Sequence, residues 1–157
     1  MLTMIQRVFA FCLALVTPTM ALAAQPLALS NQVFVEKTKV TADGQTKTSL
    51  SSPTQVLPGD ALVFVLNYRN PNSTAAKNLF VTNQLPPTVI YQQANKGALV
   101  SVDGGSNWGT LGQLSIVDSG GKRRSARPED VTHIRWQFDQ PIPAGGTGKL
   151  TFRGTVR

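Results

Sequence analysis

The segment from Pro58 to Pro87 constrains the fold more than any other part of the chain. It reads PGDALVFVLNYRNPNSTAAKNLFVTNQLPP, which is a tight turn, an alternating run, a polar loop, a second alternating run and a double proline. Large apolar side chains occupy every second position from Leu62 to Tyr68, and the same period relates Leu79, Val81 and Leu85. A period of two is typical of a strand with one buried face, and proline cannot donate a hydrogen bond to a sheet. The segment therefore predicts two strands, the second ending before Pro86.

The same alternation recurs along the rest of the chain without convincing helical periodicity beyond the N-terminal segment. Further short strands are predicted at residues 32–40, 46–50, 89–92, 98–102, 114–117, 131–138 and 150–156. Residues 119–130 are expected to form a long polar loop. About seven to nine short strands separated by turn residues are typical of an antiparallel β-sandwich. We expect one all-β domain over residues 24–157.

The first 23 residues have the pattern of a secretory signal peptide. Arg7 precedes an apolar run, residues 8–16, that is too short for a bilayer span of roughly 20 residues. Ala21-Leu22-Ala23 is a typical cleavage site, so the mature chain is predicted to start at Ala24 and to reach the periplasm or the exterior. The alternative is an uncleaved anchor. After cleavage we expect no transmembrane segment.

The single cysteine, Cys12, lies inside this N-terminal segment. The mature chain therefore has no disulfide, no cysteine nucleophile and no cysteine-based zinc site. A chain of this size can bury enough apolar surface to fold without disulfides.

Four further residues are predicted to have structural roles. Pro58 and Gly59 favour a tight turn, and the Asp60 carboxylate can accept hydrogen bonds from local amides at the start of the strand. Trp136 shares an apolar face with Ile134 and is the largest group available to join two sheets. The predicted sandwich therefore has Trp136 in its core.

The order of these motifs resembles the conserved-repeat family called domain of unknown function 11, an immunoglobulin-like extracellular module. The resemblance covers roughly residues 33–157 and rests on Pro58-Gly59-Asp60, Asn70, Leu85-Pro86-Pro87, Trp136, Ala144-Gly145 and residues 150–156. It implies an immunoglobulin-like sandwich and a structural or adhesive role at the envelope, without catalytic residues. The chain departs from the family pattern in having one copy rather than tandem copies and in having Asn83 where Asp is common.

Residues 101–108 read SVDGGSNW and resemble the Asp-box of glycosidase and glycan-binding propellers. Propellers repeat such a motif across several blades, whereas this chain is short and has it once. The alternative is a hairpin turn in which Asp103 accepts amides, Gly105 adopts a turn conformation and Trp108 packs beneath. A calcium loop is a further alternative, but the segment lacks the acidic density of calcium sites. The pattern favours the turn.

A basic cluster is the best candidate for a binding feature. The chain has a formal net charge of +7, and much of the excess lies in a candidate polyanion-binding loop formed by Lys122, Arg123, Arg124 and Arg127. Such a loop would attract acidic polysaccharides, lipopolysaccharide phosphates or anionic lipids in a salt-dependent way. The alternative is a solvated loop that keeps the protein soluble. No aromatic residue interleaves the cluster, so nucleic acid is not expected as a partner.

No catalytic pattern, metal site or cofactor site is predicted. His133 is the only histidine and is expected on the exposed face opposite Trp136, and no G-x-S-x-G elbow occurs. The sequence favours an exported, non-catalytic structural or interaction module of the bacterial cell envelope. It would contact envelope proteins through sheet edges, such as residues 32–40 or 150–156, or through loops. A module for anionic glycans or lipopolysaccharide is the alternative, and an envelope hydrolase has the least support.

The signal-peptide interpretation predicts the mass of the exported protein. Intact-mass spectrometry of the product recovered after export should give a chain that begins at Ala24. A mass that still includes residues 1–23 would contradict cleavage.

Overall fold

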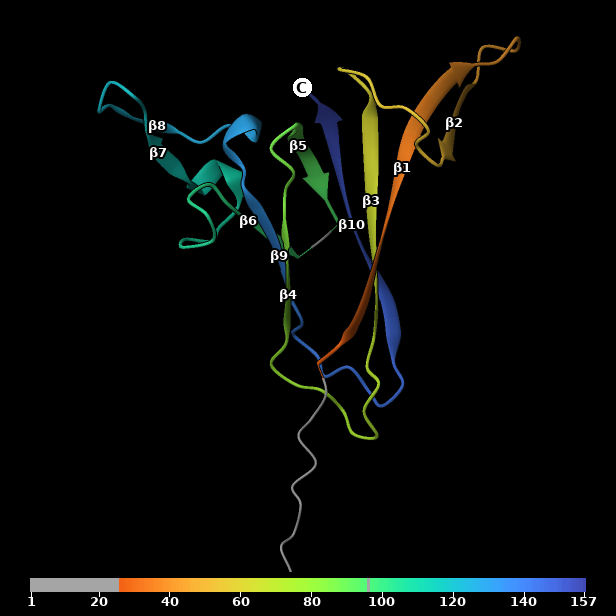
Figure 1. Cartoon of the computed structure of the whole chain (residues 1–157), viewed down its shortest axis with the longest axis vertical. Coiled ribbons are helices and arrows are strands. Elements are labelled where there is room, and N and C mark those ends of the chain that lie inside the picture. The colour runs from red at the N-terminus through yellow and green to blue at the C-terminus, as the bar shows by residue number, and fades with distance from the viewer. Residues whose placement is uncertain (1–25, 96) are drawn as a thin grey trace, which may run out of the picture.

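The computed structural model describes residues 26–95 and 97–157 as two antiparallel sheets that face each other in a sandwich (Figure 1). The larger sheet has the order β2 (Thr46–Ser51), β1 (Ala28–Val40), β3 (Ala61–Arg69), β10 (Thr147–Val156), β5 (Val89–Ala94). The smaller sheet has the order β4 (Phe80–Gln84), β9 (His133–Gln137), β6 (Ala98–Ser101). The predicted all-β sandwich is confirmed, with ten strands in the described residues rather than seven to nine. The predicted signal peptide lies outside the described residues.

Three of the four residues of the basic cluster, Lys122, Arg123 and Arg124, lie on a hairpin rather than in the long loop that the sequence predicted, and Arg127 follows this hairpin. The hairpin pairs β7 (Ser115–Val117) with β8 (Arg123–Ser125), and in Figure 1 it projects outward beyond the smaller sheet. Asp118 closes its turn, because its carboxylate accepts the amides of Gly120 and Lys122 while its carbonyl accepts that of Gly121. This side-chain support allows part of the predicted polar loop to form β8, which pairs with β7 at the predicted strand 114–117.

Two single-turn 3₁₀ helices flank this hairpin, η1 (Leu111–Gln113) before it and η2 (Pro128–Asp130) after it. Within residues 26–95 and 97–157, no helix is long and apolar enough to cross a membrane.

The sheet edges differ from those expected. β1 pairs with β3 over Ala28–Glu36 but with β2 only over Val35–Val40, whereas β10 pairs with β3 over Thr147–Thr155 and with β5 over Phe152–Val156. The prediction that residues 150–156 form an exposed edge is therefore wrong. In β1, residues 32–34 have no described partner on the β2 side and residues 37–40 have none on the β3 side, so this strand keeps unpaired backbone along part of each side. Alternation tells which face of a strand is buried, but it does not tell which strands lie beside it. The edges are β2 and β5 in the larger sheet and β4 and β6 in the smaller one.

The predicted turn before β3 is confirmed. Gly59 has a φ of 92°, and the Asp60 amide donates to the Leu57 carbonyl, as in a type II turn with proline at its second position. The Asp60 carboxylate accepts the Leu57 amide at 2.8 Å. The Gly59 amide donates to the Val156 carbonyl, so the turn is also tied to the end of β10.

The core lies where β9 of the smaller sheet meets β10 of the larger one. Trp136 is buried, as predicted, and its ring centroid lies 6.3 Å from that of Phe152, which in turn stacks on Phe64 at 4.3 Å. The Trp136 indole N–H donates to the Asn95 side-chain oxygen at 2.8 Å, which also accepts the Thr151 amide of β10. One amide side chain thus hydrogen-bonds to a residue from each sheet.

Asn70, at the end of β3, holds two loops together. It is fully buried, and its side-chain amide donates to the carbonyls of Thr74, Ile142 and Pro143 at 2.9–3.1 Å. Its side-chain oxygen accepts the backbone amide of Asn72. The loop after β3 is thereby fixed to the segment before β10, since a buried amide is costly unless it is hydrogen-bonded.

Replacement of Trp136 tests the core. We expect Trp136→Ala to lower the free energy of unfolding by about 3–5 kcal/mol, because it removes a buried aromatic side chain and its hydrogen bond. Urea unfolding measures this change. The control Val117→Ala, at a residue that is 62% exposed, should change the free energy by no more than about 0.5 kcal/mol. Equal effects of the two substitutions would contradict the core assignment.

Candidate functional site

The four predicted polyanion-binding residues do not act as one cluster of free cations. Arg124 makes a two-pronged ion pair with Asp130, with Nη1–Oδ2 and Nη2–Oδ1 distances of 2.7 and 2.8 Å. Asp130 also accepts the Arg127 backbone amide at 2.8 Å. These hydrogen bonds lower the pKa of the Asp130 carboxyl and raise the pKa of the Arg124 guanidinium. Arg124 therefore joins the hairpin to η2 rather than facing a ligand.

The other three cations of the cluster remain open to solvent. Lys122, Arg123 and Arg127 are exposed and form no ion pair with another described residue. Arg123 is partly held, because its Nη1 donates to the Ser115 hydroxyl across the hairpin at 3.2 Å. The candidate polyanion surface is thus reduced to Lys122, Arg123 and Arg127.

The Asp-box-like segment is a turn closed by its own side chains. The Asp103 Oδ1 atom accepts the Ser101 hydroxyl at 2.7 Å and the backbone amides of Ser106 and Asn107, while Oδ2 accepts the Asn107 side chain. These bonds, with the Asn107 backbone amide first, hold the pKa of Asp103 far below its ordinary value. A carboxylate surrounded by donors does not face a cation, so the geometry supports the turn rather than the calcium loop.

Gly105 and Trp108 complete this turn as predicted. Gly105 has a φ of 94° and donates its amide to the Ser101 hydroxyl, and its carbonyl accepts the Trp108 indole N–H at 2.8 Å. These bonds fold the segment back over the outer face of β6. As a result Ser101 is fully buried, although it points away from the core of the sandwich.

This turn brings Trp108 against Arg135 of β9, on the outer face of the smaller sheet. The Arg135 guanidinium carbon lies 3.8 Å from the Trp108 ring centroid and 4.6 Å from that of Phe80. Arg135 Nε donates to the Thr82 hydroxyl of β4 at 3.1 Å. We call Phe80, Trp108 and Arg135 the stacked-arginine surface.

The stacked-arginine surface was not predicted from the sequence, although the alternation of β9 carries part of its signal. Alternation places His133 and Arg135 on the face opposite Trp136, and this prediction is confirmed. His133 is half-buried, edge-on to Trp108 with ring centroids 6.4 Å apart. What alternation cannot show is that the turn after β6 folds back over that face.

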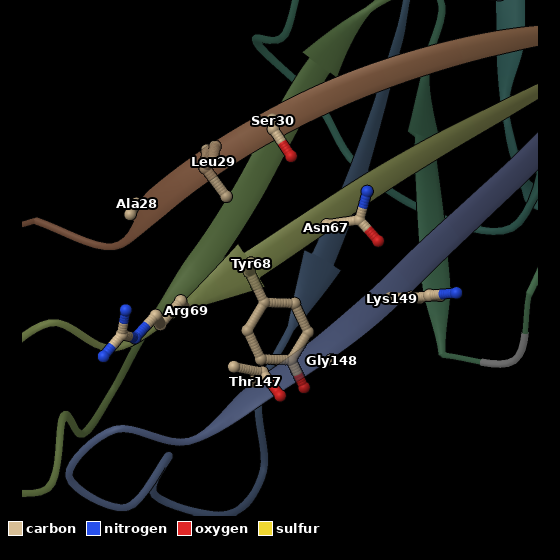
Figure 2. A pocket seen from close by; sticks show the side chains of 9 residues that line it. All are labelled: Ala28, Leu29, Ser30, Asn67, Tyr68, Arg69, Thr147, Gly148 and Lys149. Carbon is tan, nitrogen blue, oxygen red and sulfur yellow. The ribbon is translucent and has the colours of Figure 1, made fainter.

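A largely apolar hollow lies elsewhere, on the larger sheet (Figure 2). It measures about 330 Å³ and is lined by residues of β1, β3 and β10. Gly148 allows the Tyr68 ring to lie against β10, since a Cβ there would meet the Tyr68 hydroxyl at 2.3 Å. Figure 2 shows the charged ends of Arg69 and Lys149 pointing away from each other. The hollow thus does not gather polar groups around one point.

No cluster of three or more His, Cys, Asp or Glu side chains able to hold a metal ion occurs among the described residues. Comparisons of the chain with family models, with curated proteins and with solved structures find no match. The resemblance to the conserved-repeat family therefore stays a prediction, as do the envelope location and the non-catalytic role.

The Asp103 turn predicts a pH-dependent contribution to stability. Asp103→Asn should lower the melting temperature at neutral pH, because the variant loses a hydrogen-bonded carboxylate. The lowered pKa means that this stabilisation is complete above the unfolded value, about 3.9, and is lost as pH falls through the folded value. The difference between wild type and variant should therefore shrink in strong acid.

Calorimetry over the acid range measures this effect. Asp139→Asn is a suitable control, since Asp139 is exposed and accepts no hydrogen bond from another described residue, and it should melt like the wild type. An Asp103→Asn variant that matches the wild type at neutral pH would show that the turn does not depend on the carboxylate.

Proposed function

We propose that this protein is an exported, non-catalytic interaction module of the bacterial cell envelope that binds a partner protein along a sheet edge. The signal-peptide pattern of residues 1–23 and the resemblance to an extracellular sandwich family support the location. The exposed edge position of β2 supports binding of a partner strand.

The single observation that carries this proposal is the exposure of β2. All six of its residues are exposed, and it forms one edge of the larger sheet. An edge strand offers unpaired backbone groups to which a partner can add a strand. Leu50 on β2 is 50% exposed and would supply apolar contact to that partner.

The tip of the β1–β2 pair gives a further reason to expect a partner. The pairing of β1 with β3 ends at Glu36, whereas its pairing with β2 continues to Val40, so this end is a two-stranded arm. The arm extends past the end of β3 in Figure 1. Two strands alone are only marginally stable in water, and a third strand would stabilise them.

A second candidate function is the binding of anionic envelope polymers by the β7–β8 hairpin. The observation that favours it is the exposure of Lys122 and Arg123 on a projecting hairpin and of Arg127 just after it, without a carboxylate partner among the described residues. Binding of this kind weakens as salt rises, because counterions screen exposed charges.

Retention on isolated cell envelopes at low and high salt separates the two candidates. The edge variant carries Thr48→Lys and Leu50→Lys, since lysine on an edge strand opposes strand addition. Its matched control carries Gln92→Lys and Gln93→Lys, which add the same charge to β5 at the opposite edge. The hairpin variant carries serine at Lys122, Arg123 and Arg127 and keeps the structural Arg124.

We expect salt-resistant retention that is lost in the edge variant and kept in the β5 control and the hairpin variant. Salt-sensitive retention that only the hairpin variant loses would replace this proposal by the polymer-binding candidate. Failure of the wild-type protein to be retained at either salt concentration would count against both.

A further inference from the structure

We propose that the stacked-arginine surface binds a carboxylated sugar, such as a uronic acid residue of an acidic polysaccharide. This surface lies on the outer face of the smaller sheet, apart from the β2 edge and from the cations of the hairpin. The inference therefore does not depend on the proposed function, and each can fail without the other.

Arg135 is held in place without an ion pair to a carboxylate of the described residues. Its guanidinium lies over the rings of Trp108 and Phe80, and its Nε is hydrogen-bonded to Thr82. Stacking and one hydrogen bond restrict the side chain, so little conformational entropy remains to be lost when a ligand binds.

The two Nη groups of the Arg135 guanidinium remain available to donate hydrogen bonds to a ligand. Arg124 and Arg153 each face a carboxylate, of Asp130 and Glu36 respectively. The Nη atoms of Arg135, in contrast, donate no hydrogen bond to another described residue, and no carboxylate of those residues lies within ion-pair distance. A fixed planar fork with two open donors matches the two oxygens of a carboxylate.

An aromatic ring and polar side chains that could contact a sugar lie beside the Arg135 guanidinium. Phe80 is 59% exposed, so its ring can pack against the C–H face of a sugar. A hollow of about 370 Å³ lies next to it and is lined by polar groups of Asn78, Gln137 and Asp139.

The strand register places this hollow close to Arg135. Phe80 pairs with Gln137, and Thr82 pairs with Arg135, so the two pairs are two residues apart on the same face. That spacing is about 7 Å along a strand, which one sugar residue can span. The amide and carboxylate side chains of the hollow can hydrogen-bond to sugar hydroxyls, while the Arg135 guanidinium can donate two parallel hydrogen bonds to the sugar carboxylate. The combination favours a carboxylated sugar over an acidic peptide, because the polar hollow matches hydroxyls rather than a second side chain.

Titration with a tetramer of galacturonic acid tests this assignment. The readouts are calorimetry and the NMR shifts of the Arg135 Nε–H and Trp108 indole N–H groups of the purified protein. We expect saturable binding that shifts both signals, and binding of the fully methyl-esterified tetramer that is at least about tenfold weaker because the ester has no anionic oxygens. A tetraglutamate peptide should bind more weakly than the acidic tetramer.

Two variants and a control identify the residues. Arg135→Lys keeps the charge but removes the fork, and should weaken binding about tenfold. Phe80→Ser alters an exposed ring and should weaken binding several-fold, with the fold checked by circular dichroism. Arg69→Lys, on the larger sheet, makes the same chemical change at an exposed arginine and should leave binding unchanged.

Three results would overturn the inference: no binding of the tetramer, equal binding after Arg135→Lys, or tetraglutamate binding as tightly as the sugar. The last of these would assign the surface to acidic peptides.

Discussion

The packing of Trp136 against Phe152 is the interaction on which the rest of the structure depends. It joins β9, the central strand of the smaller sheet, to β10, an interior strand of the larger one. The Phe152 ring also stacks on Phe64 of β3. Asn95 reinforces the same junction by accepting hydrogen bonds from Trp136 and from the Thr151 amide. Without this junction each sheet would expose an apolar face to water.

The same strand that joins the sheets also presents the stacked-arginine surface. In β9 the side chains of Ile134 and Trp136 point inward, so those of His133 and Arg135 must point outward. Arg135 therefore lies on a backbone held by the core on one side and by two neighbouring strands at its edges. A binding group on such a strand is more precisely positioned than one on a loop. The cations of the β7–β8 hairpin do not lie on a strand that packs against the core. They are therefore better suited to long-range attraction of an anionic polymer than to recognition of a single carboxylate.

Local signals predicted much of the fold. Alternation located β3 and β9 and the face of Trp136, and the residue types of Pro58-Gly59-Asp60 predicted their turn because proline and glycine restrict the backbone directly. The order of strands in the sheets was not predictable in this way. β10 was expected at an edge but lies between β3 and β5, and β1 is paired on both sides only at Val35 and Glu36. These neighbours are set by pairings between distant parts of the chain.

The candidate site was less predictable than the fold, because it depends on contacts that are distant in sequence. The basic residues were found from composition, yet the pairing of Arg124 with Asp130 depends on the hairpin bringing them together. The contact of Arg135 with Trp108 and Phe80 combines two strands and a turn, and its individual residues carry no signal of it.

The account holds that a rigid sandwich presents fixed surface groups, and the mobility of the Arg135 side chain tests this most directly. NMR relaxation of the Arg135 Nε–H group in the free protein should give an order parameter near that of rigid backbone, about 0.85. Arg69, exposed on the larger sheet, provides the comparison with a side chain that has no stacking partner among the described residues, and should fall below about 0.6. An Arg135 as mobile as Arg69 would contradict the claim that the core and the turn together hold this group in place.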